Sequence, residues 1–205
     1  PGACVHGVRP MRSGAVALGR DRIQTLVLAA VAYLPLLAND MGRVAADTKA
    51  YLYLDPGRLL ARAPYMWQPE VAMGTVTHQN IGYLWPVGPF FWLGEAIGLP
   101  DWITQRLWLG SVLLAAGLGM RWFLRTLGWR GAALLVSALA YMLSPYLLNY
   151  VDRHSVILLP WAGLPWLMGL TVRALRTPGW RHAAIFGLVT LTVGGVNASS
   201  LLLVG

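Results

Sequence analysis

The sequence contains five apolar segments that are each long enough, or nearly long enough, to cross a lipid bilayer. A transmembrane helix needs about 20 predominantly apolar residues, because the hydrocarbon core of a bilayer is about 30 Å thick. The five segments are residues 23–38, 107–124, 131–149, 156–172 and 183 onward. This pattern predicts an all-α, polytopic membrane protein with about five transmembrane helices.

The composition agrees with a membrane protein. Hydrophobic residues make up 57% of the chain and charged residues 12%, which is about half the charged share of an ordinary soluble domain. A net charge of +8 would suggest nucleic-acid binding in a soluble chain, but in a membrane chain it reflects basic cytoplasmic loops. We therefore expect no nucleic-acid partner. The single cysteine, Cys4, excludes an intrachain disulfide, and no Cys/His spacing offers a metal site.

A sixth apolar stretch, residues 81–100, decides the topology. It is long enough to span, but it contains Pro86, Pro89, four glycines and Glu95. If it does not span, ten of the 16 basic residues fall on one side, which the positive-inside rule identifies as the cytoplasm. These ten are Arg9, Arg12, Arg20, Arg22, Arg121, Arg125, Arg130, Arg173, Arg176 and Arg181. We therefore expect residues 81–100 to lie in, or dip into, the outer interface.

This topology divides the chain into four parts. They are a cytoplasmic tail (1–22), a first transmembrane helix (23–38), an extracytoplasmic loop (39–105) and transmembrane helices two to five (106–205). Since the chain begins without a methionine and stops inside an apolar run, we expect it to be a fragment of a longer protein. The alternative for the first helix is a secretory signal peptide cleaved after Ala46. The four further spans, and the distance of that position from the apolar centre, argue against it.

The outer loop holds six of the eight acidic residues, and three of them lie within sixteen positions. Four loop residues follow the 4-3-4 spacing of one helix face: Asp40, Arg43, Asp47 and Tyr51. The motif DPGR, from Asp55, would end that helix. Loops of this length are usually functional or disordered. This one is too rich in Trp, Tyr and Leu to be disordered, so we expect amphipathic helices within it.

The acidic residues stand at the mouth of a transmembrane helix, where chemistry on a lipid headgroup could take place. Asp47 is flanked by Thr48 and Lys49, the only lysine, and is the stronger candidate. Asp40 has an equal claim to being a solvated helix end. Their function depends on what else the loop carries.

The tract at residues 74–86, GTVTHQNIGYLWP, interleaves hydroxyl, imidazole and amide groups with aromatic rings. Polar groups beside stacking surfaces are how sugars are usually held. An interfacial aromatic belt would also explain Trp85 and Trp92. His78 is as readily a structural histidine as a site residue. The tract therefore leaves sugar binding and membrane anchoring open.

Two motifs carry a resemblance to a known family. ADTKAYLYLDPGRLL at residues 46–60 and GTVTHQNIGYLWPVGPFFWL at residues 74–93 look like the amino-terminal part of the actinobacterial arabinofuranosyltransferase D family. One helix, a long outer loop that opens with acidic residues, and then closely spaced helices are similar to the C-type glycosyltransferases. The resemblance runs from about residue 20 to the end. Family members are several times longer, so it implies an amino-terminal, catalytic-side fragment.

The resemblance implies an inverting glycosyltransferase of the bacterial plasma membrane, with its active site on the extracytoplasmic side. The donor would be polyprenyl-phosphoryl arabinose, and the acceptor would be the arabinan of arabinogalactan or lipoarabinomannan. An acidic residue early in the first outer loop acts as the base in the wider fold, and the matching positions here are Asp47 and Asp40. No cofactor is implied, and the participation of a divalent cation is left open.

Other loop residues would serve the two substrates. The candidates to compensate the departing phosphate are Lys49, Arg43, Arg58, Arg62 and His78. The candidates for sugar binding are Glu70, Asn80, Tyr83 and Trp85. Three alternatives stay open: transfer of another sugar, such as mannose, from a polyprenyl-phosphate donor; a transporter; and a non-catalytic membrane scaffold.

Overall fold

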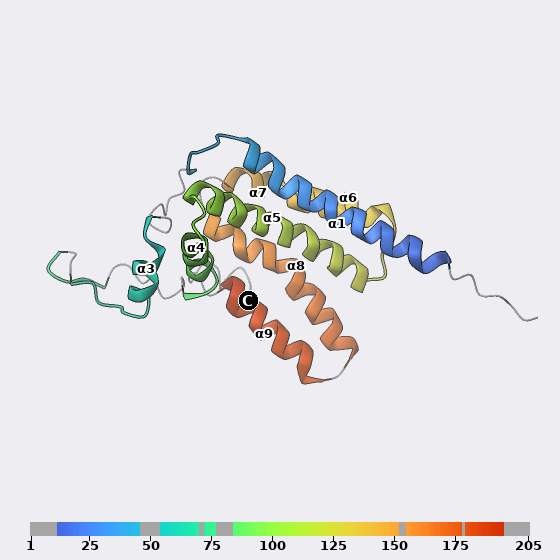
Figure 1. The fold of residues 1–205 in the computed structure, drawn as a ribbon. Coiled ribbons are helices and arrows are strands. Elements are labelled where there is room, and N and C mark those ends of the chain that lie inside the picture. The colour runs from blue at the N-terminus through green and yellow to red at the C-terminus, as the bar shows by residue number, and fades with distance from the viewer. Residues whose placement is uncertain are drawn as a thin grey trace, which may run out of the picture.

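The computed structural model describes residues 12–45, 54–69, 72–76, 84–151, 155–177 and 179–194. Within these ranges the chain is almost entirely helical (Figure 1). The helices are α1 (Arg12–Ala38), α3 (Pro56–Arg62), α4 (Val87–Ala96), α5 (Asp101–Thr126), α6 (Ala132–Met142), α7 (Pro145–Tyr150), α8 (Ser155–Arg176) and α9 (Trp180–Gly194). One isolated antiparallel bridge joins Gln68 and Thr75. The prediction of an all-α fold is confirmed.

Helix α5 lies at the centre of the bundle and packs against α1, α6 and α8, while α9 packs against α8. Close approach between these helices depends on glycines that face large side chains. A Cβ added to Gly110 of α5 would lie 2.3 Å from the ring of Tyr33 on α1, and one added to Gly163 of α8 would lie 2.7 Å from Val193 on α9. Small residues at helix contacts are typical of membrane bundles, in which van der Waals packing drives association.

Three helical segments of the described chain are long and apolar enough to cross a membrane: 19–38, 101–126 and 132–150. They coincide with the first three predicted spans. Helix α1 begins at Arg12, eleven residues before the predicted span. Only the part of a helix inside the bilayer must be apolar, so the helix can extend beyond it through polar residues. Helices α8 and α9 occupy the other two predicted segments, and the total of five spans stays a prediction.

The third predicted segment is divided by Pro145. Helix α6 ends at Met142 and α7 begins at Pro145, where the Ser144 hydroxyl accepts the N–H of Leu147 at 3.4 Å. Proline lacks an N–H and clashes with the preceding turn, so it is favoured at a first helical position and disfavoured in a helix interior. The apolar pattern predicted the segment, but this proline breaks the helix within it.

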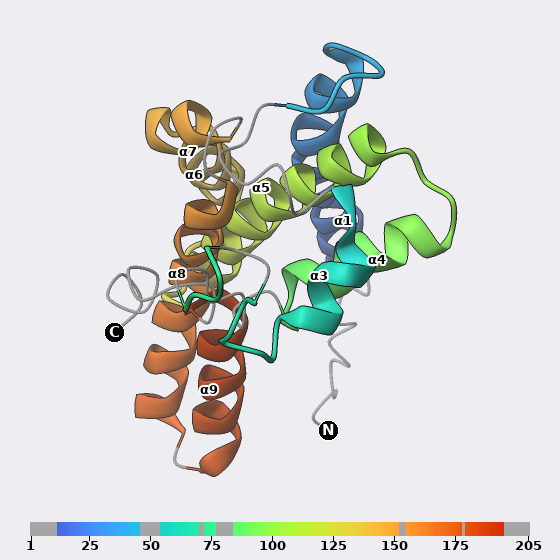
Figure 2. The ribbon, with the colours of Figure 1, turned by 90° about the vertical axis from the view of Figure 1, so that its left-hand side faces the viewer.

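The stretch at residues 81–100 contains α4, a helix of 10 residues. At about 1.5 Å per residue it is about 15 Å long, half the thickness of the hydrocarbon core. Helix α3 packs against α4, and both lie at the end of the bundle where α5 begins (Figure 2). The short length of α4 is consistent with the prediction that residues 81–100 lie in the membrane interface and do not cross the bilayer.

Cysteine labelling would test the topology on which the membrane sides depend. In a Cys4→Ala background, a membrane-impermeant maleimide should modify Met73→Cys in intact cells and spare Trp129→Cys until the cells are opened. Both positions suit the reagent, since Met73 is fully exposed and Trp129 is 51% exposed. Labelling of Trp129→Cys from outside would reverse the assignment of the two membrane sides.

Candidate functional site

The predicted site residues that the structure describes belong to three separate parts of the chain segment that joins α1 to α5: the turn after α1, helix α3, and the residues before α4. Figure 1 shows where this segment runs. The described site residues are Asp40, Arg43, Arg58, Arg62 and Trp85. Six others lie outside the described residues: Asp47, Lys49, Glu70, His78, Asn80 and Tyr83. The roles of those six stay predictions.

The chain leaves α1 in a turn. Asp40 has φ 43° and Gly42 has φ 79°, both in the left-handed region that interrupts a right-handed helix. The N–H of Arg43 donates to the Asp40 carbonyl oxygen at 3.2 Å, and residues 43–45 are not helical. The predicted helix is therefore wrong for Asp40 and Arg43, whose side chains are exposed. Asn, Asp and Gly favour turns, and here they outweigh the helical spacing.

Gln105, in the second turn of α5, fixes the end of this segment to the bundle. Its Oε1 accepts the N–H of Ala45 at 2.7 Å, and its Nε2 donates to the Ala45 carbonyl oxygen at 3.1 Å. The side chain is 1% exposed. One carboxamide thus satisfies both backbone groups of Ala45, as a neighbouring strand would. Asp47 follows Ala45 by two positions, so the segment that carries it starts from a fixed point.

Helix α4 covers the start of α5 next to this contact. A Cβ added to Gly94 would lie 2.5 Å from the Thr104 side chain, so the two helices touch there without a side chain between them. The rings of Phe90 and Phe91 lie against Trp108, with centroids 5.2 and 6.1 Å apart. Thr104 and Gln105 are both buried at this start of α5, and hydrogen bonds are stronger in such a low-dielectric interior.

Arg106 is a buried cation beside Gln105, with a side chain that is 4% exposed. A buried guanidinium is costly unless an anion or hydrogen-bond acceptors compensate it. Its place at the start of α5, at the end of the bundle opposite the basic loops, sets it apart from the arginines on which the predicted topology rests. Arg106 already has an interaction partner, and its buried charge makes it a candidate to add positive potential at this end of the molecule.

Asp55 has a structural role that the sequence did not predict. Its Oδ1 accepts the N–H of Arg58 at 2.9 Å, and Pro56 occupies the first position of α3. This arrangement caps a helix at its amino terminus. The motif DPGR thus begins a helix, and Arg58 is thereby placed in the first turn of α3. The helix that this motif was predicted to end falls on residues 46–53, which lie outside the described residues.

Trp85 is the predicted sugar-binding residue that the structure describes. Its Nε1 donates to the Thr192 Oγ1 on α9 at 2.9 Å, and its side chain remains 51% exposed. An anchored ring with an accessible surface suits stacking against a sugar. It equally suits an aromatic residue at a membrane interface, so this geometry leaves both alternatives open.

Sequence reasoning missed Gln105 and Arg106. The predicted boundary between the outer loop (39–105) and the later helices (106–205) falls between these two residues, so neither was assigned a function. A signal was available, because Thr104, Gln105 and Arg106 form a polar run directly before the apolar segment 107–124. In addition, an arginine on the predicted outer side runs against the charge asymmetry from which the topology is predicted.

Comparison with known proteins identifies relatives of the chain. A family model described as the N-terminal GT-C domain of alpha-(1->3)-arabinofuranosyltransferase matches residues 30–204. The chain is 37% identical over 177 residues to the alpha-(1->3)-arabinofuranosyltransferase of Mycobacterium tuberculosis, covering 84% of this chain and 13% of that protein. For the protein of the same name from Mycolicibacterium smegmatis, identity is 35% over 176 residues, with 84% and 12% covered.

The fold has a similar solved relative. The single-particle cryo-electron microscopy structure of the arabinofuranosyltransferase AftD from mycobacteria aligns with a TM-score of 0.81 and 33% sequence identity. The alignment covers 89% of this chain and 14% of that one. The chain thus spans only a small part of the length of the proteins it matches.

Proposed function

Because the chain belongs to the family of α-(1→3)-arabinofuranosyltransferases and matches their N-terminal GT-C domain, we propose that the protein transfers arabinofuranose from a polyprenyl-phosphate donor to cell-wall arabinan. The single observation that carries the proposal beyond family membership is the Gln105–Ala45 contact. It ties the segment that leads to Asp47 to the start of α5, beside the buried Arg106.

The proposed reaction is a single displacement at the anomeric carbon. An acceptor hydroxyl oxygen attacks that carbon from the face opposite the phosphate, the bond from the carbon to the phosphate oxygen breaks, and the configuration inverts. Asp47 takes the proton of the attacking hydroxyl, which requires its carboxylate within hydrogen-bond reach, about 2.6–3.2 Å. Positive charge develops on the sugar as in glycoside hydrolysis, and a nearby carboxylate also stabilises it.

The lipid phosphate leaves with negative charge that cations must compensate. Lys49, Arg43, Arg58 and His78 are the proposed loop residues for this role. Arg106 adds a buried cation close to the start of α5, where the low dielectric makes its field stronger than that of an exposed arginine. This supports placing the departing phosphate near the Gln105 contact, with the prenyl chain in the bilayer.

The proposed site lies on the extracytoplasmic side of the bacterial plasma membrane. The charge asymmetry supports this side, because the proposed site residues stand at the opposite end of the bundle from the basic loops. The donor could therefore present its sugar to the loop without leaving the bilayer. Glu70, Asn80, Tyr83 and Trp85 are the proposed sugar contacts.

A transfer assay tests the function. The full chain, purified and reconstituted in liposomes, should move radiolabelled arabinose from polyprenyl-phosphoryl arabinofuranose to an arabinan oligosaccharide. Methylation of the product should show a new 1→3 linkage. The matched control is polyprenyl-phosphoryl mannose, which shares the lipid and phosphate and should give no product. Transfer of mannose alone would support the other glycosyltransferase alternative, and transfer of neither sugar would contradict the proposal.

A further inference from the structure

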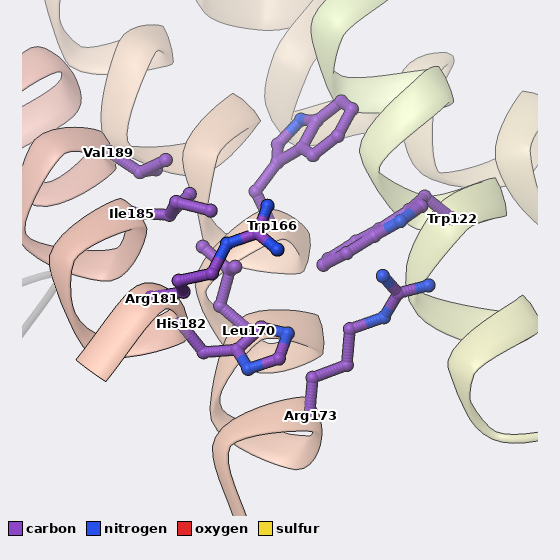
Figure 3. Close-up of a pocket in the computed structure, with 8 residues that line it drawn as sticks. All are labelled: Trp122, Trp166, Leu170, Arg173, Arg181, His182, Ile185 and Val189. Carbon is purple, nitrogen blue, oxygen red and sulfur yellow. The ribbon is translucent and has the colours of Figure 1, made fainter. Parts of the chain in front are cut away.

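A cavity of about 400 Å³ opens between α5, α8 and α9, at the end of the bundle opposite the proposed transfer site. Its lining includes two tryptophans, two arginines and one histidine: Trp122, Trp166, Arg173, Arg181 and His182. Figure 3 shows Arg181 and His182 extending from α9 toward the same space that Trp166 and Leu170 border from α8. Its volume falls within the range of roughly 300–1,000 Å³ typical of small-molecule sites.

The aromatic wall of this cavity is rigidly built. A Cβ added to Gly169 of α8 would lie 2.1 Å from the Trp122 ring, and one added to Gly119 of α5 would lie 2.5 Å from Trp166. On each helix, a glycine therefore leaves the space that the tryptophan ring of the other helix occupies. The two rings stack with centroids 5.4 Å apart, and Trp166 Nε1 donates to the Ala115 carbonyl oxygen at 2.9 Å. The wall is therefore fixed before any ligand arrives.

The lining of the cavity concentrates positive charge. The Arg173 guanidinium lies 4.9 Å from the centroid of the Trp122 ring, a cation–π contact that positions it at the cavity edge. None of the lining residues is acidic. Within the described chain, the side chains of Arg173, Arg181 and His182 make no hydrogen bond or ion pair. Their donors are available to an anion.

Neighbouring arginines at the same end are already engaged. Arg125 forms an ion pair with Asp21, Arg121 donates to Thr25 at 2.8 Å, and Arg176 donates to the Thr126 carbonyl oxygen. Arg130, at the same end, has no described side-chain partner either, so the cavity is distinguished by gathering three cationic or hydrogen-bonding side chains around one aromatic-walled space.

We propose that this cavity binds the phosphate headgroup of an anionic membrane phospholipid. The helices end here, in the last turn of α8 and the first turn of α9, where a headgroup would lie beside the bundle. Basic pockets between transmembrane helices on the cytoplasmic side bind such headgroups, and the charge asymmetry predicts that this end is cytoplasmic. Arg181, His182 and Arg173 would contact the phosphate, and Ile185 and Val189 would contact the glycerol and first acyl carbons.

Thermal unfolding of the full chain in a neutral detergent would measure this binding. The unfolding midpoint should rise once added dioleoyl phosphatidylglycerol exceeds its Kd and then increase with the logarithm of its concentration. It should stay constant with dioleoyl phosphatidylcholine, which has the same acyl chains. A ligand that binds the folded state stabilises it according to its concentration and Kd. Near a membrane surface each arginine contributes about 1 kcal/mol, so Arg181→Gln should weaken the lipid affinity about fivefold.

Arg130→Gln is the matched control, because Arg130 is an exposed arginine of the same end that does not line the cavity. It should leave the affinity unchanged. Without lipid, Arg181→Gln should unfold at the temperature of the parent, since its side chain makes no described polar contact. Equal weakening by both variants, or an unfolding midpoint of the parent that does not rise with dioleoyl phosphatidylglycerol, would overturn the proposal. An equal rise of the midpoint with inorganic phosphate would also overturn it, by identifying a soluble phosphate as the ligand.

Discussion

Replacing Asp47 with asparagine is expected to lower the rate of arabinose transfer by about 10²–10⁴, the usual loss when a general base is removed. Asparagine keeps nearly the same size and leaves the loop able to pack, but it cannot accept the proton of the acceptor hydroxyl. The variant should therefore insert into the membrane and bind the polyprenyl-phosphoryl donor as the parent does. Two measurements separate the loss of catalysis from any loss of donor binding. The first is the single-turnover transfer rate at saturating donor, and the second is the donor Kd from equilibrium titration.

Asp40→Asn is the matched control for this prediction. Asp40 is exposed in the turn after α1, with its backbone in the left-handed region that asparagine also tolerates. The change should reduce transfer much less than Asp47→Asn. If Asp40→Asn abolished transfer and Asp47→Asn did not, the two assignments would be exchanged. Normal turnover by both variants and by the double variant would remove catalysis from this loop and favour a scaffold.

The sequence predicted the helices well, because their determinants are local. A run of apolar residues predicts a buried helix whatever surrounds it, and α1, α5 and α8 lie where such runs occur. The family resemblance likewise rested on contiguous motifs. The errors arose where backbone conformation decided the outcome: the turn at Asp40 and Gly42 replaced an expected helix. Spacing shows which side chains could share a face, but not whether the helix exists.

The contacts of the candidate site were less predictable, because they join residues far apart in the sequence. Gln105 and Ala45 are 60 positions apart, and neither residue type indicates the other. The aromatic wall of the cavity depends on Gly119 and Gly169, which carry no chemistry of their own. In both cases the informative feature is that two helices approach closely at one particular residue, which only the packed bundle reveals.

Loss of the Gln105 contact should disable transfer without removing donor binding. In Gln105→Leu the new side chain has a similar volume but leaves the N–H and carbonyl oxygen of Ala45 without their partner. Each of these groups that stays buried and unpaired lowers the free energy of unfolding by about 1–3 kcal/mol. The segment before Asp47 would then detach from α5. Because misplacing a catalytic group by about 1 Å can reduce the rate about 10²-fold, we expect kcat to fall by that factor with the donor KM nearly unchanged.

Gln24→Leu separates this effect from a general loss of stability. Gln24 is also a buried glutamine, 5% exposed, and its Nε2 donates to the Gly131 carbonyl oxygen at 3.3 Å, at the opposite end of the bundle. Both variants should unfold at lower temperature, but only Gln105→Leu should lose turnover. Amide hydrogen exchange provides the direct readout, since the Ala45 N–H should lose protection in Gln105→Leu and keep it in Gln24→Leu. Parental kcat in a Gln105→Leu protein whose Ala45 amide exchanges freely would show that this contact holds the loop without positioning the base.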